Sequence, residues 1–144
     1  MMKSSTLLKL FSFAFLLFPL VADALELPQT KPGLWEMRFQ STNDGVAEEV
    51  TTSRICVNEK DIKEAESLLK KSCSKYEVHK EGDKWILNQV CKFGPLTTSL
   101  QTTAEYHGEN SYHFVSDGTY NPPTVTGYSR AHAVTDGKWL GPCK

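Results

Sequence analysis

The chain has 144 residues, with 16 basic and 17 acidic side chains and a formal net charge of −1 at pH 7. A chain so evenly mixed lacks the concentrated basic surface that nucleic acid requires, so we expect no nucleic-acid partner. Its length leaves room for one domain.

The first 24 residues are typical of a secretory signal peptide. Lys3 and Lys9 form a basic start, an apolar run follows over residues 10–21, and small residues precede the expected cleavage after Ala24. The run has about 12 apolar residues, whereas a membrane-spanning helix needs roughly 20. We therefore expect an exported protein, periplasmic or secreted. Its mature part, residues 25–144, is expected to be a single disulfide-linked β-rich domain without a membrane span.

Two strands are expected before any helix. The stretch GLWEMRFQ (Gly33–Gln40) alternates, with Trp35, Met37 and Phe39 on one face, which is typical of a half-buried strand. The turn-forming residues STNDG follow, and we expect Val46–Val57 to return as the second strand.

One helix is expected, over Glu59–Lys71. Asn58 is a favourable N-cap, Glu59 and Asp61 place acidic groups in the first turn, and two lysines end the last turn. The apolar stripe of this helix is narrow, so we expect the helix to lie on a sheet with its charged side in water.

The rest of the chain is expected to form strands joined by short turns. A hairpin is expected around Gly82, strands follow at Thr97–Tyr106 and Ser111–Asp117, and Thr124–Val134 gives the last strand. About seven strands with short connections predict an antiparallel, meander-like sheet, curved or partly closed into a barrel. With its single helix, the domain is expected to be α+β and mostly β.

All four cysteines lie in the mature domain, and an even number in a small exported domain predicts two disulfides. Cys56 and Cys73 lie on either side of the expected helix, whose ends are roughly 20 Å apart, which is too far for a direct bond. Cys73 and Cys91 lie symmetrically about Gly82 in the expected hairpin, where a bulge could adjust the register. We therefore predict Cys73–Cys91, which leaves Cys56–Cys143 as the second disulfide.

The residues that could carry chemistry do not form a recognisable catalytic or metal-binding pattern. GYSRA (Gly127–Ala131) lacks the second glycine of a nucleophile elbow and sits in a strand pattern. His107, His113 and His132 do not have the spacing of metal ligands. We therefore expect no metal, no cofactor and no enzymatic activity. The alternative from another class is an exported hydrolase with an unrecognised site.

Aromatic side chains recur along several expected strands and allow two interpretations. They can form one core that the helix covers, or they can line an apolar groove on a curved sheet that binds one ligand. A candidate interaction loop is present as well, because Tyr120, Pro122, Pro123 and Tyr128 give a stiff, partly apolar surface. The aromatic residues concerned are Trp35, Phe39, Trp85, Tyr106, Tyr112, Phe114, Tyr120 and Tyr128.

The landmarks of the chain are PGLWEM at Pro32–Met37, ICVNEKDI at Ile55–Ile62, the pair Cys73 and Cys91, and WLGPC at Trp139–Cys143. Together they resemble a family of small exported bacterial proteins catalogued as domain of unknown function 3617. The resemblance implies a periplasmic or secreted, disulfide-linked β-rich domain, and it implies no activity. We expect a non-enzymatic binding or interaction module of the envelope, whose partner is a small apolar ligand or another envelope protein. A purely structural role in the envelope is a further alternative.

Overall fold

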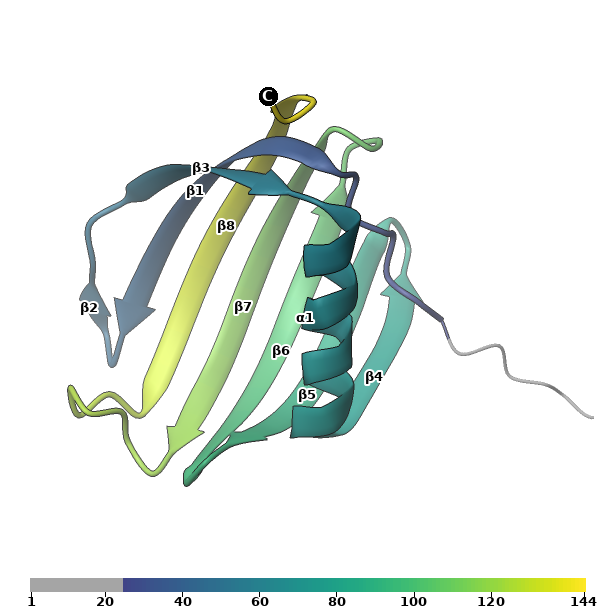
Figure 1. Cartoon of the computed structure of the whole chain (residues 1–144). Helices are drawn as coiled ribbons and strands as arrows, with labels where there is room; N and C mark the ends of the chain where they lie inside the picture. Colours follow the sequence, from purple (N-terminus) through teal and green to yellow (C-terminus); the bar gives the residue numbers. More distant parts are fainter. Residues whose placement is uncertain (1–24) are drawn as a thin grey trace, which may run out of the picture.

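The computed structural model describes residues 25–144, and the expected signal peptide lies outside this part of the chain (Figure 1). None of its helices is long and apolar enough to cross a membrane. The elements in chain order are β1 (Gly33–Asn43), β2 (Val46–Ala47), β3 (Thr51–Val57), α1 (Glu59–Ser72), β4 (Cys73–Glu81), β5 (Lys84–Phe93), β6 (Leu96–Tyr106), β7 (Ser111–Asn121) and β8 (Arg130–Gly141).

All the strands belong to one curved, antiparallel sheet that is not closed into a barrel (Figure 1). The strand order is β2-β1-β8-β7-β6-β5-β4, and β3 pairs with β1 on the same side as β2. The predicted mostly β fold with one helix is therefore confirmed. The sheet departs from a simple meander because the first strand lies between β3 and the last strand, β8. One free edge of the sheet is therefore formed by β2 and β3, and the other free edge is β4.

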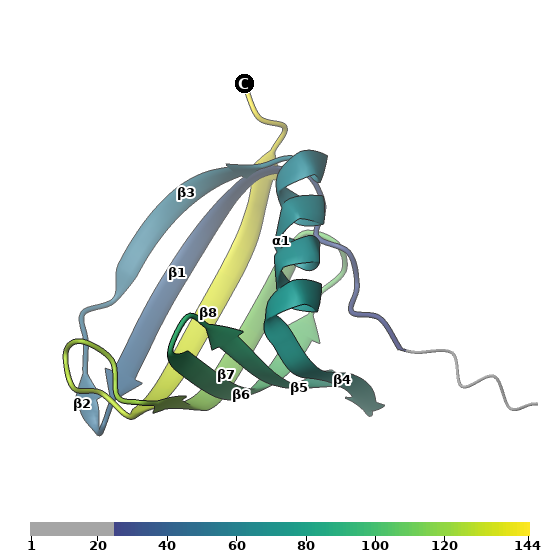
Figure 2. The same ribbon diagram turned by 60° about the horizontal axis from the view of Figure 1, so that its bottom comes forward.

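The chain crosses from one edge of the sheet to the other through α1. Asn58 begins the helix, because its side chain accepts a hydrogen bond from the Asp61 N–H at 2.9 Å and its own N–H donates to the Asp61 carboxylate at 3.4 Å. This reciprocal capping satisfies backbone donors that the first turn leaves unpaired. The predicted helix is thus confirmed, and it ends one residue later than expected. Figures 1 and 2 show α1 on one face of the sheet, where it packs against β4 and β5.

Two disulfides fasten the ends of α1 to the sheet. Cys56, near the end of β3, is bonded to Cys143 just beyond β8, and Cys73 at the start of β4 is bonded to Cys91 of β5. Both predicted pairings are confirmed. The β4–β5 turn has two residues, which by itself would not place the second pair opposite each other. A bulge at Ser74 shifts the register and brings Cys73 across from Cys91.

The last strand begins later than expected. β8 covers Arg130–Gly141 instead of the predicted Thr124–Val134. The residues before β8 form a turn, because the Thr124 N–H donates to the Tyr128 carbonyl at 2.8 Å and the Tyr128 N–H donates to Thr124 Oγ1 at 3.1 Å. As a result, the C-terminal residues belong to a strand with a neighbour on either side, β1 and β7.

The second predicted strand, Val46–Val57, is interrupted between β2 and β3. Glu48 turns back onto β1, where its carboxylate accepts hydrogen bonds from Ser41 Oγ at 2.9 Å and from Asn43 Nδ2 at 2.7 Å. Its N–H also donates to the Ser41 carbonyl at 2.8 Å. These bonds hold residues 48–50 out of the strand. In contrast, β7 continues past the expected end of its strand.

The antiparallel register divides the side chains between two faces, and we name the face toward α1 the inner face and the opposite one the outer face. The aromatic core lies on the inner face. The Trp35 and Tyr112 ring centroids are 5.4 Å apart, and those of Tyr112 and Phe114 are 4.2 Å apart. Gly137 lies opposite Tyr112, and a Cβ on it would come within 2.1 Å of the tyrosine ring. The glycine therefore makes room for the aromatic stack.

Candidate ligand-binding face

The inner face carries almost no charge. Among the paired strand positions that the register places on this face, Lys80 is the only charged residue. Its Nζ lies 5.2 Å from the ring centroid of Trp85. A surface of this composition offers dispersion contacts and hydrogen bonds, and it offers very little to a charged group.

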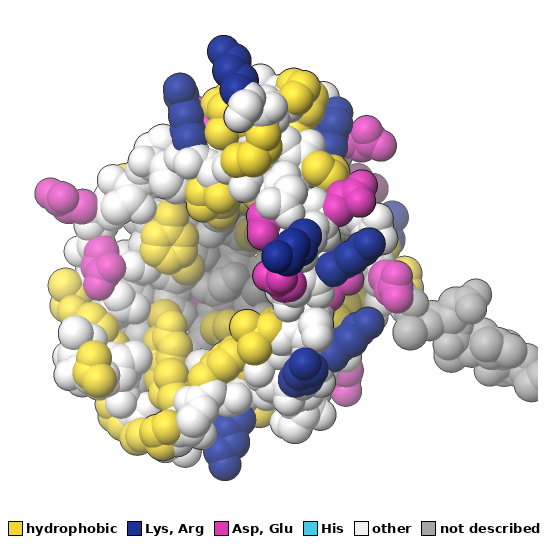
Figure 3. All heavy atoms as spheres, viewed as in Figure 1, with side chains coloured by type: hydrophobic (Ala, Val, Ile, Leu, Met, Phe, Trp, Pro, Cys, Tyr) yellow, Lys and Arg dark blue, Asp and Glu magenta, His cyan; other side chains and the backbone are white. Residues whose placement is uncertain are grey.

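Small side chains hollow out the inner face in front of the two strands β7 and β8. Figure 3, in the orientation of Figure 1, shows this hollow beside α1, with hydrophobic side chains around it and charged side chains over the helix. The small residues at its floor are Ala131, Ala133 and Thr135 of β8 and Ser116 of β7, whereas Gly118 and Gly137 on the same face are covered by the side chains of Leu100 and Tyr112.

The helix does not fill this hollow. No residue of α1 is buried, and its Ile62 and Leu69 are only half-buried. Large apolar side chains of the inner face consequently stay in contact with water: Phe39 is 41% exposed, Ile55 45% and Tyr76 47%. Phe39 and Ile55 come from β1 and β3 near one edge of the sheet, and Tyr76 comes from β4 at the other edge. The helix therefore leaves part of the inner face open to water, beside the aromatic core.

One end of the inner face is closed by the two termini of the domain. Trp35 and Trp139 are register partners on β1 and β8. The Trp35 indole N–H donates to the Lys31 carbonyl at 2.8 Å, and the Trp139 indole N–H donates to the Pro32 carbonyl at 3.1 Å. The Lys31 Nζ lies 3.8 Å from the Trp139 ring centroid. We name this closed side the Trp35 end.

Two tyrosines at the Trp35 end are partly shielded from water. Burial raises the pKa of Tyr106 to about 12, and it raises the pKa of Tyr112 as well. A phenol with a raised pKa is one whose ionised form has lost contact with water. Tyr106 lies against Phe114, with ring centroids 5.5 Å apart.

The opposite side, which we name the Asn43 end, carries hydroxyl and amide groups. Thr102 Oγ1 and Ser116 Oγ form a hydrogen bond of 2.8 Å between β6 and β7. Ser41 and Asn43 of β1 and Gln89 of β5 face the same side by register. The inner face therefore changes along its strands, from an aromatic cluster at the Trp35 end, through the hydroxyl groups of Thr102 and Ser116 midway, to a mixed Asn43 end where the amides of Asn43 and Gln89 share the face with Leu100 and Tyr76.

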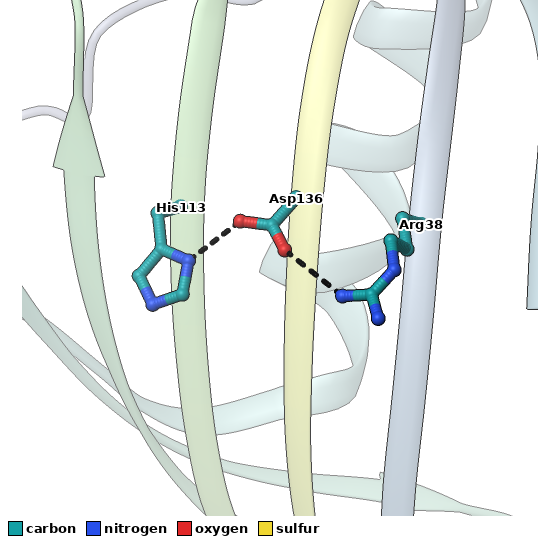
Figure 4. A network of polar contacts seen from close by, with 3 residues as sticks. All are labelled: Arg38, His113 and Asp136. Atoms are coloured by element: carbon teal, nitrogen blue, oxygen red, sulfur yellow. Dashed lines mark hydrogen bonds and ion pairs between the residues drawn. The ribbon is translucent and has the colours of Figure 1, made fainter. Parts of the chain in front are cut away.

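The outer face carries two histidine–aspartate pairs. His113 Nδ1 lies 2.6 Å from Asp136 Oδ1, and the other oxygen of this carboxylate lies 3.9 Å from Arg38 (Figure 4). His132 Nδ1 lies 2.7 Å from Asp117 Oδ1. The signal that could have revealed these pairs is the pattern H-x-V-x-D, which occurs in HFVSD of β7 and again in HAVTD of β8. Antiparallel pairing sets each histidine opposite the aspartate of the other strand.

The structure does not bring the three histidines of the sequence together. His113 and His132 belong to separate pairs, and His107 lies in the turn after β6. Across residues 25–144, no three His, Cys, Asp or Glu side chains gather in a way that could hold a metal ion. Ser129 of the GYSRA motif lies in the loop before β8, where its hydroxyl donates to Asp44 at 3.1 Å.

The candidate interaction loop lies between β7 and β8. Tyr120 and Tyr128 are half-buried, while Pro122 and Pro123 are exposed. The loop is tied to the β1–β2 turn by Asp44, whose carboxylate accepts hydrogen bonds from the Ser129 and Arg130 N–H groups at 3.0 and 2.9 Å. The Ser129 N–H is the largest of the causes that lower the pKa of Asp44. The role of this loop in binding stays a prediction.

An open groove of about 1050 Å³ crosses the strands near the Asn43 end, and its lining includes Gln89, Gly118 and Ala131 of the inner face. It runs from Asp44 and Arg130 to Lys75, and most of its lining side chains, such as Gln101, belong to the outer face by register. Its lining contains charges of both signs and no Phe, Tyr or Trp residue. It therefore lacks the aromatic surface that the inner face offers.

One protein family, described as "Protein of unknown function (DUF3617)", matches residues 30–143. The match covers every strand, the helix and all four cysteines, and it confirms the resemblance drawn from the landmarks of the sequence. No curated protein and no solved structure matches the chain. The two disulfides are consistent with a location outside the cytoplasm.

Proposed function

Because the chain belongs to the DUF3617 family of proteins of unknown function, which supplies no activity, we propose from its own geometry that it is a non-enzymatic binding protein of the bacterial envelope. Its ligand is a small molecule whose apolar part occupies the hollow between the sheet and α1. The two disulfides and the predicted signal peptide support a periplasmic or secreted location.

The observation that carries the proposal is an apolar, concave and uncharged surface that the protein leaves uncovered. Phe39, Ile55 and Tyr76 are each more than two-fifths exposed on it. Exposed apolar surface gathered around one hollow marks a binding site more often than it marks an ordinary surface. A ligand contact that buries about 400 Å² of apolar area, counting both partners, contributes on the order of 10 kcal/mol before the entropic cost of association. With an association cost of about 4 kcal/mol, the remaining ~6 kcal/mol corresponds to a dissociation constant of tens of micromolar.

A dye titration with two matched variants tests this proposal. The probe is N-phenyl-1-naphthylamine, which is uncharged and fluoresces strongly only in an apolar environment. Ala133→Phe fills the floor of the hollow on β8, whereas Thr119→Phe adds the same side chain at an exposed position on the outer face of β7. We expect Ala133→Phe to weaken dye binding at least tenfold and Thr119→Phe to leave it unchanged.

The proposal fails if the wild-type protein does not bind the dye, or if Ala133→Phe binds it as well as the wild type does. Thermal unfolding of both variants shows whether the fold is intact. A loss of binding then counts in favour of the proposal only when the melting temperature of Ala133→Phe lies close to that of Thr119→Phe.

A further inference from the structure

This inference rests on the proposed function and specifies its ligand. We infer that the hollow takes an uncharged amphiphile with one long apolar chain, whose chain end lies at the Trp35 end and whose polar end lies at the Asn43 end. Three properties of the inner face lead to this ligand: the length of the hollow, the near absence of charge, and the direction in which the polarity changes.

The hollow runs along β8, with Ser116 of β7 beside it. The uncovered small inner-face residues of β8 extend from Ala131 to Thr135, and the Tyr112 ring covers Gly137 beyond them. From the first to the last of these five residues, a β-strand spans roughly 14 Å at about 3.4 Å per residue. A trough of this length beside a helix fits an extended chain better than it fits a compact ring system, which would leave most of the trough in contact with water.

The inner face also selects against a charged ligand group. Lys80 is the only charged residue at its paired positions, and its ammonium group already lies over the Trp85 ring. A carboxylate or phosphate placed elsewhere on this face would lose water without gaining an opposite charge, which costs several kcal/mol. Hydroxyl groups avoid this cost, because the Asn43 end offers partners of the same kind.

The polarity of the face fixes the direction of the bound chain. At the Trp35 end, Trp35, Tyr112 and Phe114 pack in one aromatic cluster, and the backbone of Lys31 and Pro32 closes the face beyond it. Midway along the face, the hydroxyl groups of Thr102 and Ser116, and beyond them toward the Asn43 end the amide of Gln89, can exchange hydrogen bonds with a polar head group. A single-chain amphiphile therefore gains most with its methyl end toward Trp35.

An anionic amphiphile would bind in the opposite direction. Its only cationic partner on this face, Lys80, is the register partner of Trp85 and so lies in the aromatic half of the sheet. A fatty acid that bound through this lysine would place its carboxylate there and its chain toward Asn43. The direction of the bound chain therefore distinguishes the two kinds of ligand.

Nitroxide quenching of tryptophan fluorescence measures this direction. All three tryptophans, Trp35, Trp85 and Trp139, lie in the half of the sheet near the Trp35 end. The probes are two monoacylglycerols of the same chain length, one labelled next to the glycerol and one labelled near the methyl end. We expect the methyl-end label to quench the wild-type protein at least twofold more strongly at equal occupancy, which displacement of N-phenyl-1-naphthylamine reports in the same samples.

Every other result of this experiment contradicts a different part of the proposal. Equal quenching, or stronger quenching by the glycerol-end label, overturns the direction while the proposed function stands. Failure of monoacylglycerol to displace a dye that the protein does bind overturns the ligand class. Absence of dye binding overturns the proposed function itself.

A pair of variants tests the polar end independently. Ser116→Val removes a hydroxyl from the inner face at the Asn43 end, and Thr103→Val makes a similar change on the outer face of β6. We expect Ser116→Val to weaken monoacylglycerol binding about three- to tenfold more than it changes dye binding, and Thr103→Val to change neither. Unchanged monoacylglycerol binding by Ser116→Val overturns the placement of the polar head.

Discussion

Loss of the Cys56–Cys143 disulfide should destabilise the protein more than loss of Cys73–Cys91. The bonded residues are 87 positions apart in the first disulfide and 18 in the second. In the chain-entropy model, loops of these sizes correspond to about 4.6 and about 3.2 kcal/mol at 25 °C. Both values are large beside the total of about 5–15 kcal/mol that is typical of a domain.

The assay is urea unfolding followed by tryptophan fluorescence. One variant carries Cys56→Ser with Cys143→Ser and the other carries Cys73→Ser with Cys91→Ser, so neither has an unpaired thiol. We expect the free energy of unfolding to fall by about 4–5 kcal/mol in the first and by about 3 kcal/mol in the second. A reversed order, or a loss below about 1 kcal/mol for the Cys56–Cys143 pair, would refute the account, since the longer loop is the source of the difference.

Three further predictions concern single residues. Gly137→Ala should lower the free energy of unfolding by about 1–3 kcal/mol, measured by urea unfolding, because the new Cβ meets the Tyr112 ring; an unchanged value would contradict this packing. The pKa of Tyr106 is about 12, above the value of about 10 in an unfolded chain, so the stability that its protonated phenol contributes is complete below about pH 10 and declines as the pH rises toward 12. Unfolding measured across this range should show a smaller decline for Tyr106→Phe, and equal declines would contradict the assignment. Asp44→Ala should accelerate hydrogen exchange at the Ser129 amide, measured by NMR, while amides in the centre of β8 exchange as before.

The local elements could be predicted from the sequence because their causes lie within a few residues. The helix follows from the side chain of Asn58 and the acidic residues just after it, and the structure shows the same capping contacts. The hairpin follows from its turn residues and from the positions of Cys73 and Cys91, but its other pairs, such as Glu77 with Asn88, lie one residue away from a register centred on Gly82, and the bulge at Ser74 absorbs the difference. In each case the interacting groups are close along the chain, so the spacing of residue types carries the information.

The parts that could not be predicted depend on residues far apart in the chain. No local pattern in the sequence predicts that β1 pairs with β8 as well as with β3. This pairing nevertheless places the C-terminal residues inside the sheet. The hollow is equally non-local, because the small residues of β8 become a floor only once α1 lies at β4 and β5. The two histidine–aspartate pairs were missed because each forms across strands, between His113 and Asp136 and between His132 and Asp117.

The attachment of α1 has a consequence for how the hollow can open. Cys56 lies shortly before the helix and Cys73 directly after it, and both are bonded to other parts of the chain. With no buried residue of its own, α1 is the kind of segment that unfolds locally at a free energy well below that of the whole domain. Such an excursion leaves the sheet and both of its covalent anchors in place, so the space between α1 and the sheet can widen while the rest of the domain stays folded.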